Sequence, residues 1–294
     1  MTSFRTGGPA ALLGRPGDAE ELAGLASWAS RNGLPFLVLG GGTNLLADDM
    51  GFRGLAAVLS GSFRKASYLD GGEGGRGASR ILAGAGVRLS EVADMARAAG
   101  RSGWARLRGI PGTLGGALVM NAGANGTETG DLTVSVKVLP VTGAGVSGAA
   151  AEIGREGAGF RYRGSDLAAA GVVLGAELLL GDPAPEEEIR RLERETLDAR
   201  RRRLPAEPSA GSVFRNPEGD SAGRLVDACG LKGRRIGGAV VSPRHANVIV
   251  NAGGATSSEV RALAALARHE VLRRFGTELE AEVLMLDTRG VPYP

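Results

Sequence analysis

The feature that most constrains the fold of this chain is an apolar segment, residues 35–39, that runs directly into three consecutive glycines at 40–42. The segment predicts a buried strand. Glycines after a strand let the backbone approach a ligand closely, and successive N–H groups can form a site for an anion. Thr43 and Asn44 add side-chain donors. With 49 glycines in 294 residues, an ordinary turn is an equally good interpretation.

A second glycine-rich stretch, Gly109 to Gly116, repeats this pattern and is followed by Asn121 to Gly126. Pro111 stiffens the turn. Neither glycine-rich stretch has the G-x-G-x-x-G spacing of the common dinucleotide fingerprint, and no lysine follows the glycines as in a P-loop. The residues alone therefore leave phosphate binding and ordinary turns both open.

Composition excludes several classes of protein. The 35 Lys and Arg residues nearly balance 32 Asp and Glu residues, and aromatic residues make up only 4%, which argues against a nucleic-acid-binding surface. The single cysteine, Cys229, and two histidines argue against a disulfide framework and a metal site. No signal peptide and no membrane-spanning run is recognisable, so we expect a soluble cytoplasmic protein.

Hydrophobic periodicity and capping residues predict an alternation of helices and strands. The predicted helices are Asp18–Asn32 with Asp18 as cap, Ser90–Ala99 with Ser90 as cap, a charged helix after 182–185 with Ile189, Leu192, Thr196 and Ala199 on one face, and a final helix from a Ser257 cap to Gly276. The predicted strands are 35–39, 55–59, 81–83, 134–140, 146–153, 172–180 and 279–286, with a hairpin turn at 142–145.

Three polar side chains are candidates for chemistry. Ser212 lies in the turn Ser209 to Pro217, Arg163 lies in a short polar segment, and Glu282 lies on the final predicted strand. The hydroxyl could donate a proton, and the guanidinium could pair with a carboxylate. Each residue taken alone more commonly caps a turn, forms a surface ion pair or faces solvent.

Eight stretches taken together are more informative than any one. They are FRTGGPA (4–10), LGGGTNLL (39–46), GIPGTLGG (109–116), YRGS (162–165), SAGSVFRNP (209–217), GLKG (230–233), SPRHAN (242–247) and EAEV (280–283). In this order they resemble the UDP-N-acetylenolpyruvoylglucosamine reductase (MurB) family, FAD-dependent oxidoreductases of peptidoglycan synthesis. The resemblance extends over nearly the whole chain.

The resemblance implies an α+β fold. We expect an FAD-binding domain of the vanillyl-alcohol-oxidase type at 1–182, with two α/β subdomains divided near 60–75. An α/β substrate-binding domain is expected at 183–278, and a C-terminal strand at 279–294 that returns to the FAD side. The connection from Leu180 to Ser209 contains no tyrosine, so the chain is similar to the shorter type that lacks a Tyr-bearing loop.

The resemblance also assigns the FAD-binding residues. They are Gly40, Gly41, Gly42, Thr43, Asn44, Leu45, Ile110, Pro111, Gly112, Thr113, Gly115, Gly116, Asn121, Ala122 and Gly123. Because the two glycine-rich loops contain no histidine or cysteine, we expect FAD to be bound there without a covalent link.

Catalytic and substrate-binding residues follow from the same resemblance. NADPH reduces FAD and leaves, and the reduced flavin gives a hydride to the terminal carbon of UDP-GlcNAc-enolpyruvate. The resemblance implies that Ser212 is the general acid for the other alkene carbon, and that Arg163, and Glu282 if it is protonated, stabilise charge on the carboxylate. Asn216, Arg203, Arg215 and His245 are expected to contact the substrate. Arg203 and Arg215 stand where the family usually has lysine, and Asn125 stands where it usually has an aromatic residue.

Two other functions remain open from the sequence. One is another FAD-dependent oxidoreductase of the same fold, which would need no Ser212 proton donor. The other is a nucleotide-sugar binding protein that has lost catalysis. For the reductase we expect a monomer that takes a small-molecule substrate and binds no nucleic acid, membrane or metal.

Overall fold

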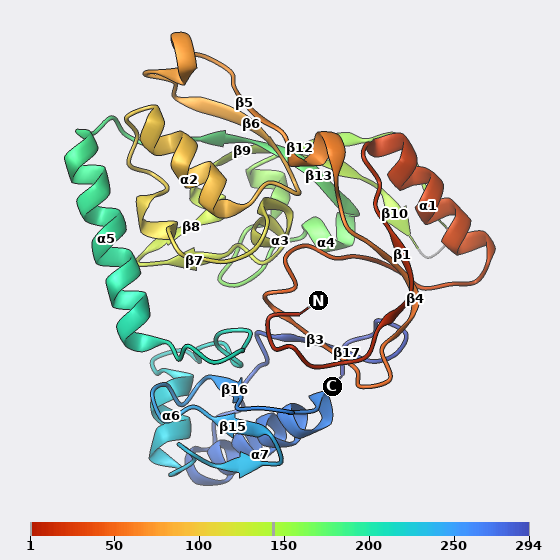
Figure 1. The fold of residues 1–294 in the computed structure, drawn as a ribbon, viewed down its shortest axis with the longest axis vertical. Helices are drawn as coiled ribbons and strands as arrows, with labels where there is room; N and C mark the ends of the chain where they lie inside the picture. Colours follow the sequence, from red (N-terminus) through yellow and green to blue (C-terminus); the bar gives the residue numbers. More distant parts are fainter. Residues whose placement is uncertain (1, 143–144, 294) are drawn as a thin grey trace. The chain divides into compact units, whose positions relative to one another are not determined.

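The computed structural model of the chain describes residues 2–142 and 145–293, which form two compact units (Figure 1). Unit 1 consists of Met1–Leu12, Gly42–Gly54 and Arg201–Pro294, and unit 2 consists of Leu13–Gly41 and Leu55–Arg200. The chain therefore passes from one unit to the other four times. The domain limits 1–182, 183–278 and 279–294 stay a prediction, because these units are defined by contacts alone.

Unit 2 is built on a five-stranded antiparallel sheet in the order β12-β9-β13-β6-β5. The strands are β5 (Ala66–Tyr68), β6 (Arg80–Gly84), β9 (Thr133–Leu139), β12 (Ala151–Gly154) and β13 (Val172–Leu179). The predicted strands at 81–83, 134–140 and 172–180 are confirmed. The predicted strand 146–153 is found only in part: β12 pairs with β9, with Val136 opposite Ile153, whereas residues 147–150 lie outside any strand. Residues 143 and 144 of the predicted hairpin turn lie outside the described residues.

Shorter strands lie outside this five-stranded sheet. The strands β1 (Ala10–Gly14), β4 (Phe52–Ala57) and β2 (Phe36–Val38) form a three-stranded sheet in that order, in which β2 and β4 run parallel. The pairs β7 (Gly123–Ala124) with β8 (Thr127–Glu128), and β10 (Val141–Thr142) with β11 (Gly145–Val146), are antiparallel. The first glycine-rich loop follows β2 with only Leu39 between them, so a strand precedes the loop as predicted. This strand is half-buried, however, and not buried as expected.

Among its described residues, unit 2 has four helices that pack apolar residues into one core and a fifth that contributes no residue to it. They are α1 (Ala19–Arg31), α2 (Leu89–Ala98), α3 (Leu114–Val119), α4 (Leu167–Ala170) and most of α5 (Glu186–Arg203), with 3-10 turns η1 (Gly61–Arg64), η2 (Glu73–Gly75), η3 (Ala105–Leu107), η4 (Thr129–Leu132) and η5 (Glu156–Ala158). Asp18 caps α1 as predicted, by accepting from the Glu21 N–H. The predicted Ser90 cap is wrong, since Arg88 holds that position in α2.

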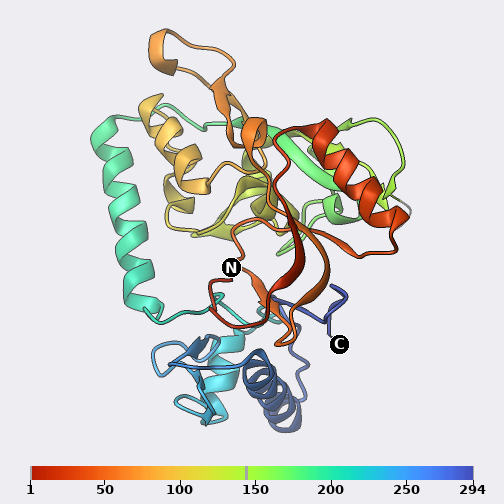
Figure 2. The same ribbon diagram turned by 45° about the vertical axis from the view of Figure 1, so that its right-hand side comes forward.

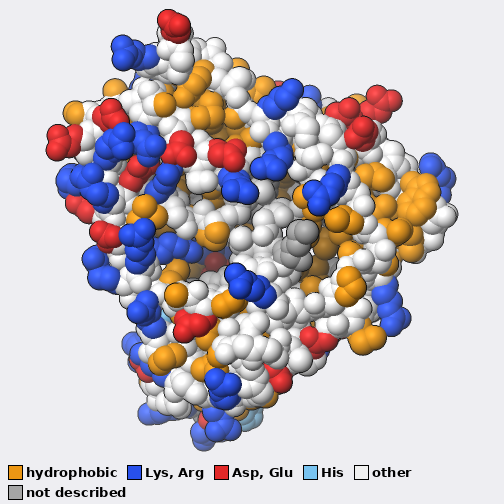
Figure 3. All heavy atoms as spheres, viewed as in Figure 1, with side chains coloured by type: hydrophobic (Ala, Val, Ile, Leu, Met, Phe, Trp, Pro, Cys, Tyr) orange, Lys and Arg blue, Asp and Glu red, His pale blue; other side chains and the backbone are white. Residues whose placement is uncertain are grey.

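The core of unit 2 is centred on Trp104, which is fully buried and donates its indole N–H to the Leu179 carbonyl at 2.9 Å. Burial removes the hydrogen bond that the indole N–H would make to water, and this carbonyl replaces it. The long charged helix α5 departs from expectation on one face. Of the predicted apolar positions only Ile189 is buried, and the second buried side chain is Glu193. Mixed acidic and basic side chains cover the outer surface of α5 (Figure 3).

Unit 1 has its own core and a three-stranded antiparallel sheet, β14 (Arg235–Ile236), β15 (Ala239–Val241) and β16 (Ile249–Asn251). The helices α6 (Ala222–Ala228) and α7 (Ser257–Phe275) lie beside this sheet (Figures 1 and 2). The cap of α7 is Thr256 rather than the predicted Ser257, because the Thr256 hydroxyl accepts from the Glu259 N–H. Gly276 ends α7 with a left-handed φ of 67°, as predicted.

A parallel pair joins residues from opposite ends of the sequence in unit 1. The strand β3 (Leu45–Ala47) pairs with β17 (Leu284–Leu286), with Leu45 opposite Leu284. The predicted final strand at 279–286 is thus shorter than expected. Its first residues instead run beside the Ser212 segment, where Phe214 forms an isolated bridge with Ala281. Among the described residues, no helix has the length and apolar character needed to cross a bilayer.

Candidate active site

The two glycine-rich loops meet in unit 2. A Cβ atom added to Gly40 would lie 2.6 Å from the Thr113 hydroxyl oxygen, so a larger residue there would collide with the Thr113 side chain as it is placed. Gly40 and Gly41 are exposed, as are Pro111 and Gly116 of the second loop. The loops therefore form a continuous, side-chain-poor surface that suits the close approach of a flat or phosphorylated cofactor.

The second loop is fixed from behind by the turn that follows β6. Leu114 and Gly115 donate their N–H groups to the Val87 and Ala85 carbonyls, each at 2.8 Å. A Cβ atom at Gly115 would lie 2.9 Å from the Cβ of Ala85. The row of bare N–H groups expected from the sequence is therefore not available at the start of α3. The loop contributes a rigid shape more than an anion site.

Replacing Gly40 with alanine is expected to weaken FAD binding about tenfold. The added methyl group must displace the Thr113 side chain, and such overpacking costs about 1–3 kcal/mol, of which about 1.4 kcal/mol corresponds to a factor of ten. The dissociation constant is measured by quenching of flavin fluorescence. Gly24→Ala is the matched control, because a Cβ at Gly24 meets nothing within 4 Å. An unchanged affinity of Gly40→Ala for FAD would contradict binding of the cofactor against the two glycine-rich loops.

The rest of the first loop belongs to unit 1. Asn44 donates its amide N–H to the backbone carbonyl of Glu282 at 2.9 Å, and its own carbonyl accepts from Leu284 N–H at 3.0 Å. Gly42 accepts from the Ser3 N–H, and Leu45 begins β3. The structure thus brings together Asn44, predicted to bind FAD, and Glu282, predicted to act on the substrate.

Ser212 and Glu282 lie on neighbouring backbone segments. Glu282 donates its N–H to the Val213 carbonyl at 2.8 Å, and Arg215 donates its N–H to the Glu280 carbonyl at 2.9 Å. On its other side, Ser212 forms an isolated bridge with Val248. Both side chains are half-buried. Two of the three proposed catalytic residues are therefore held by one short ladder.

Asn247 holds this ladder in place through two side-chain hydrogen bonds. This role was not predicted from the sequence. Asn247 is 3% exposed, its side-chain oxygen accepts from Phe214 N–H at 2.9 Å, and its NH₂ donates to the Phe214 carbonyl at 2.8 Å. Both bonds go to the backbone two residues beyond Ser212. A lone asparagine in a loop gives no sequence signal for this role, since its partner is 33 residues away.

The residues predicted to bind substrate are distributed around the same part of unit 1. Asn216 is exposed, and its side-chain oxygen accepts from the Ala222 N–H at the start of α6, at 3.1 Å. Arg215 and Glu280 form an ion pair of 3.5 Å. Arg203 is exposed at the end of α5. The ion pair orients Arg215 on the ladder that carries Ser212.

His245 lies half-buried between α6 and the Asn247 loop. Its Nδ1 accepts from the Asn247 N–H at 3.2 Å, and a Cβ at Gly223 would lie 3.3 Å from its Cε1. Burial lowers the pKa of His245, and the cations of Arg203 and Lys232 lower it further. Burial and the two nearby cations thus all favour the neutral form of the ring, and the positive charge near it comes from Arg203 and Lys232.

Arg163 lies in unit 2, in a tight turn with a left-handed φ of 56°. The turn is closed by two backbone bonds between Arg161 and Gly164, of 2.9 and 3.0 Å. Its guanidinium stands 4.9 Å from the ring centre of Tyr162 and 3.8 Å from Glu128 Oε1. Arg163 is thus presented by a rigid turn and faces an acidic side chain.

Asn121, predicted to bind FAD, is 2% exposed and uses its side chain internally. Its oxygen accepts from the Gly130 N–H at 2.8 Å, and its NH₂ donates to Glu128 Oε2 at 2.5 Å and to the Arg161 carbonyl at 3.0 Å. Any cofactor contact at Asn121 must therefore come from its backbone. The neighbouring Ala122 and Gly123 are half-buried, and Gly123 pairs with Glu128 across β7 and β8.

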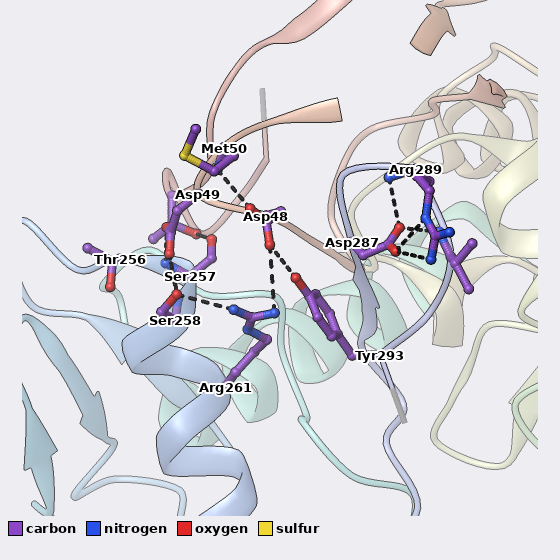
Figure 4. Close-up of polar contacts among 12 residues, drawn as sticks. Asp48, Asp49, Met50, Thr256, Ser257, Ser258, Arg261, Asp287, Arg289 and Tyr293 are labelled. Carbon is purple, nitrogen blue, oxygen red and sulfur yellow. Dashed lines mark hydrogen bonds and ion pairs between the residues drawn. The ribbon is translucent and has the colours of Figure 1, made fainter. Parts of the chain in front are cut away.

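A polar cluster anchors the chain around β3 in unit 1 (Figure 4). Asp48 accepts from the Tyr293 hydroxyl and from the Met50 N–H and lies 3.7 Å from Arg261, whose guanidinium stacks on the Tyr293 ring at 3.8 Å. Asp49 accepts from the N–H groups of Ser257 and Ser258 at the start of α7, at 2.6 and 2.8 Å. These contacts fix the segment that follows the first glycine-rich loop.

Replacing Asp49 with asparagine is expected to destabilise the protein by about 1 kcal/mol near pH 7, because the carboxylate accepts from the N–H groups of Ser257 and Ser258 and faces the positive end of α7. Burial raises the pKa of Asp49, but bonds from Ser258 and Ser257 and the charge of Arg261 outweigh it, so the net pKa is lowered. The stabilisation is complete above the pKa of an unfolded aspartate, about 4, and is lost as the pH falls through the lower folded value.

The check is urea unfolding of wild type and Asp49→Asn at pH 7 and at pH 3. The difference between the two proteins should shrink at the lower pH. A difference that is the same at both pH values would contradict a stabilising role for the charge of Asp49.

Two family models and several known proteins match this chain. A family model described as the C-terminal domain of UDP-N-acetylenolpyruvoylglucosamine reductase matches residues 203–286, and an FAD binding domain model matches residues 10–147. The UDP-N-acetylenolpyruvoylglucosamine reductase of Anaeromyxobacter sp. (strain Fw109-5) is 44% identical over 288 residues, covering 97% of this chain and 85% of the relative. That of Moorella thermoacetica is 43% identical over 284 residues, covering 96% and 89%.

A solved structure agrees with these matches. The crystal structure of UDP-N-acetylenolpyruvylglucosamine reductase from Thermus caldophilus superposes with a TM-score of 0.80 at 36% identity, covering 97% of this chain and 95% of that one. The FAD-binding fold and the glycine cradle define an FAD-dependent oxidoreductase of α+β class. The chain belongs to the UDP-N-acetylenolpyruvoylglucosamine reductase family. The family, fold class and FAD requirement expected from the sequence are confirmed.

Proposed function

We propose that this protein reduces UDP-N-acetylglucosamine enolpyruvate to UDP-N-acetylmuramate, with NADPH as the hydride donor, in the synthesis of peptidoglycan precursors. One observation carries the proposal beyond family membership. The ladder that joins Val213 to Glu282 also holds Asn44 through the Glu282 carbonyl, so the proposed acid, a proposed carboxylate-binding residue and the cofactor loop are tied together within unit 1.

The cofactor fits the residues present. The two loops present a glycine-rich surface where Gly40 lies against Thr113, and no histidine or cysteine lies in either loop to form a covalent link. FAD held there would supply the hydride chemistry that links NADPH to the terminal carbon of the enolpyruvyl group. The residues of this chain then have three tasks: to hold the carboxylate, to supply a proton and to hold the nucleotide.

We assign the proton transfer to Ser212. Hydride addition at the terminal carbon places negative charge on the neighbouring carbon and its carboxylate, and the Ser212 hydroxyl supplies the proton that completes the reduction. Arg163 stabilises the charge on the carboxylate through its own positive charge, and the protonated form of Glu282 does so by donating a hydrogen bond. Ser212 recovers its proton from solvent. The alkene gains one hydride and one proton, so the reaction balances.

We assign the diphosphate to the basic side of unit 1. Arg203 and Lys232 are close enough to His245 to lower its pKa, and Arg215 is oriented by Glu280. Guanidinium groups bind phosphate oxygens in a forked geometry that lysine does not reproduce, so Arg203 and Arg215 suit this task. Asn216 and neutral His245 add uncharged hydrogen-bonding groups. We further propose that the protein acts as a monomer in the cytoplasm, which sedimentation and cell fractionation would test.

The visible spectrum of the purified protein tests this function. Under anaerobic conditions, NADPH should bleach a yellow flavin, and UDP-GlcNAc-enolpyruvate should restore the colour. Recovery with oxygen but not with this substrate would instead indicate an oxidase of the same fold. No flavin even after reconstitution with FAD would indicate a nucleotide-sugar binding protein.

A further inference from the structure

Glu128 is a half-buried carboxylate in unit 2 to which the proposed reaction assigns no task. It lies on β8 and faces two residues whose backbones are strained. Asn121 and Arg163 are both non-glycine residues in the left-handed region, with φ values of 42° and 56°. Such conformations cost about 1 kcal/mol or more each and persist where surrounding contacts hold them in place. Glu128 contacts the side chains of both.

The position of the Glu128 carboxylate is fixed by its surroundings. Its Oε2 accepts from Asn121 at 2.5 Å, and Asn121 is itself held by Gly130 and Arg161. The backbone of Glu128 pairs with Gly123 and donates its N–H to Asp131 Oδ2 at 2.9 Å. The other carboxylate oxygen, Oε1, is directed to the Arg163 guanidinium at 3.8 Å.

The turn that carries Arg163 is held by contacts that do not involve Glu128. Its backbone is closed between Arg161 and Gly164, and the Ser165 hydroxyl donates to the Val119 carbonyl at 2.9 Å. Removing the charge of Glu128 should therefore leave the turn folded and take away one anionic neighbour of the guanidinium. The separation of 3.8 Å is too long for a tight hydrogen bond, so the contact acts on Arg163 mainly through charge.

We propose that Glu128 is a positioning residue that orients the Arg163 guanidinium toward the carboxylate of the substrate. The carboxylate bonded to buried Asn121 gives Arg163 a fixed anionic neighbour, which restricts a long and flexible side chain before the substrate arrives. The inference rests on the proposed function, and specifically on the role given to Arg163. It predicts that Glu128 affects the step in which the substrate is reduced and leaves the reduction of flavin by NADPH unaffected.

The test compares Glu128→Gln with wild type in the two half-reactions, each followed by stopped-flow absorbance of the flavin in the holoenzyme. Glutamine keeps the size and an acceptor for Asn121 but loses the charge. We expect oxidation of the reduced flavin by UDP-GlcNAc-enolpyruvate to slow about 10- to 100-fold, the loss typical of a misplaced reactive group. The KM for NADPH, the FAD content and the melting temperature should stay at wild-type values.

A double-mutant cycle separates positioning from a structural role. If Glu128 acts through Arg163, Glu128→Gln should have no further effect in an Arg163→Ala background. Asp166→Asn is the matched control, because it removes an exposed ion pair with Arg161, 2.6 Å long, beside the same turn. That variant should retain the wild-type rate in both half-reactions.

Five outcomes would overturn the proposal. A wild-type rate in Glu128→Gln would show that the charge is not needed. Equal slowing of both half-reactions, or an equal effect of Glu128→Gln with and without Arg163, would indicate a structural role. If the substrate does not reoxidise the reduced flavin of the wild-type protein, the proposed function itself is wrong. If the substrate does reoxidise it but Arg163→Ala has the wild-type rate, only the role of Arg163 is wrong. In both cases the positioning role of Glu128 is also wrong.

Discussion

Ser212→Ala should slow the reduction of UDP-GlcNAc-enolpyruvate about 100- to 10,000-fold, the range for loss of a positioned general acid, while NADPH reduces the flavin at nearly the wild-type rate. The hydroxyl has no task until the substrate carbon needs a proton, so the first half-reaction is unaffected. The ladder of Val213 and Glu282 uses only backbone groups and survives the substitution. Single-turnover measurements of flavin absorbance separate the two steps.

Ser209→Ala is a suitable control for Ser212→Ala. Ser209 is a half-buried serine three residues earlier in the same segment, and no catalytic task is assigned to it. It should leave both half-reactions unchanged. If Ser212→Ala instead slows flavin reduction and substrate reduction equally, the proton-donor role is wrong and the hydroxyl supports the fold.

Glu193→Ala should have the largest effect on stability, about 3 kcal/mol, the lower end of the range for removing one partner of a buried ion pair. Glu193 is 6% exposed, its Oε2 accepts from Arg97 Nη1 at 2.6 Å, and its Oε1 lies 3.8 Å from Arg108 Nη1. Burial lowers the pKa of Arg97, but Glu193 and Asp94 outweigh it and the net pKa is raised. Without Glu193, two largely buried guanidinium groups share Asp94.

The free energy of unfolding, measured in urea with saturating FAD, checks this expectation. Glu195→Ala provides the control, since Glu195 lies on the same helix and forms an exposed pair with Arg191 at 2.9 Å. Exposed pairs of this kind contribute about 0–1 kcal/mol. If the two variants are equally stable, the buried network contributes no more than a surface pair.

Local features of the fold could be predicted because their causes lie within a few residues. Asp18 caps α1, Gly276 ends α7, and the apolar run at β13 forms a strand, each as the sequence indicates. The exceptions are also local. Thr256 and not Ser257 caps α7, because both hydroxyl residues suit the position and only the backbone path decides between them. Sequence patterns locate such caps to within about two residues.

Features that depend on distant partners could not be predicted from residue patterns. Glu193 is buried in a helix of strongly charged composition, because its partners come from α2 and from the residue before the second glycine-rich loop. The bond from Asn44 to Glu282 joins residues 238 positions apart. The resemblance to a family pointed to the residues of the site. The contacts that hold these residues together depend on the tertiary structure and could not be predicted from the sequence.

The pairing of β3 with β17 has a consequence for the order in which the chain can fold during synthesis. β3 is made early, and its parallel partner is made 239 residues later, with Leu45 opposite Leu284. The Asn44 side chain and the Asp48 and Asp49 carboxylates also bond to residues after position 256. Unit 2 can therefore assemble around its own sheet first, while residues 42–54 lack these partners until the last segment leaves the ribosome. A chain interrupted before residue 280 would lose the Glu282 end of its active site and the anchor of its first cofactor loop together.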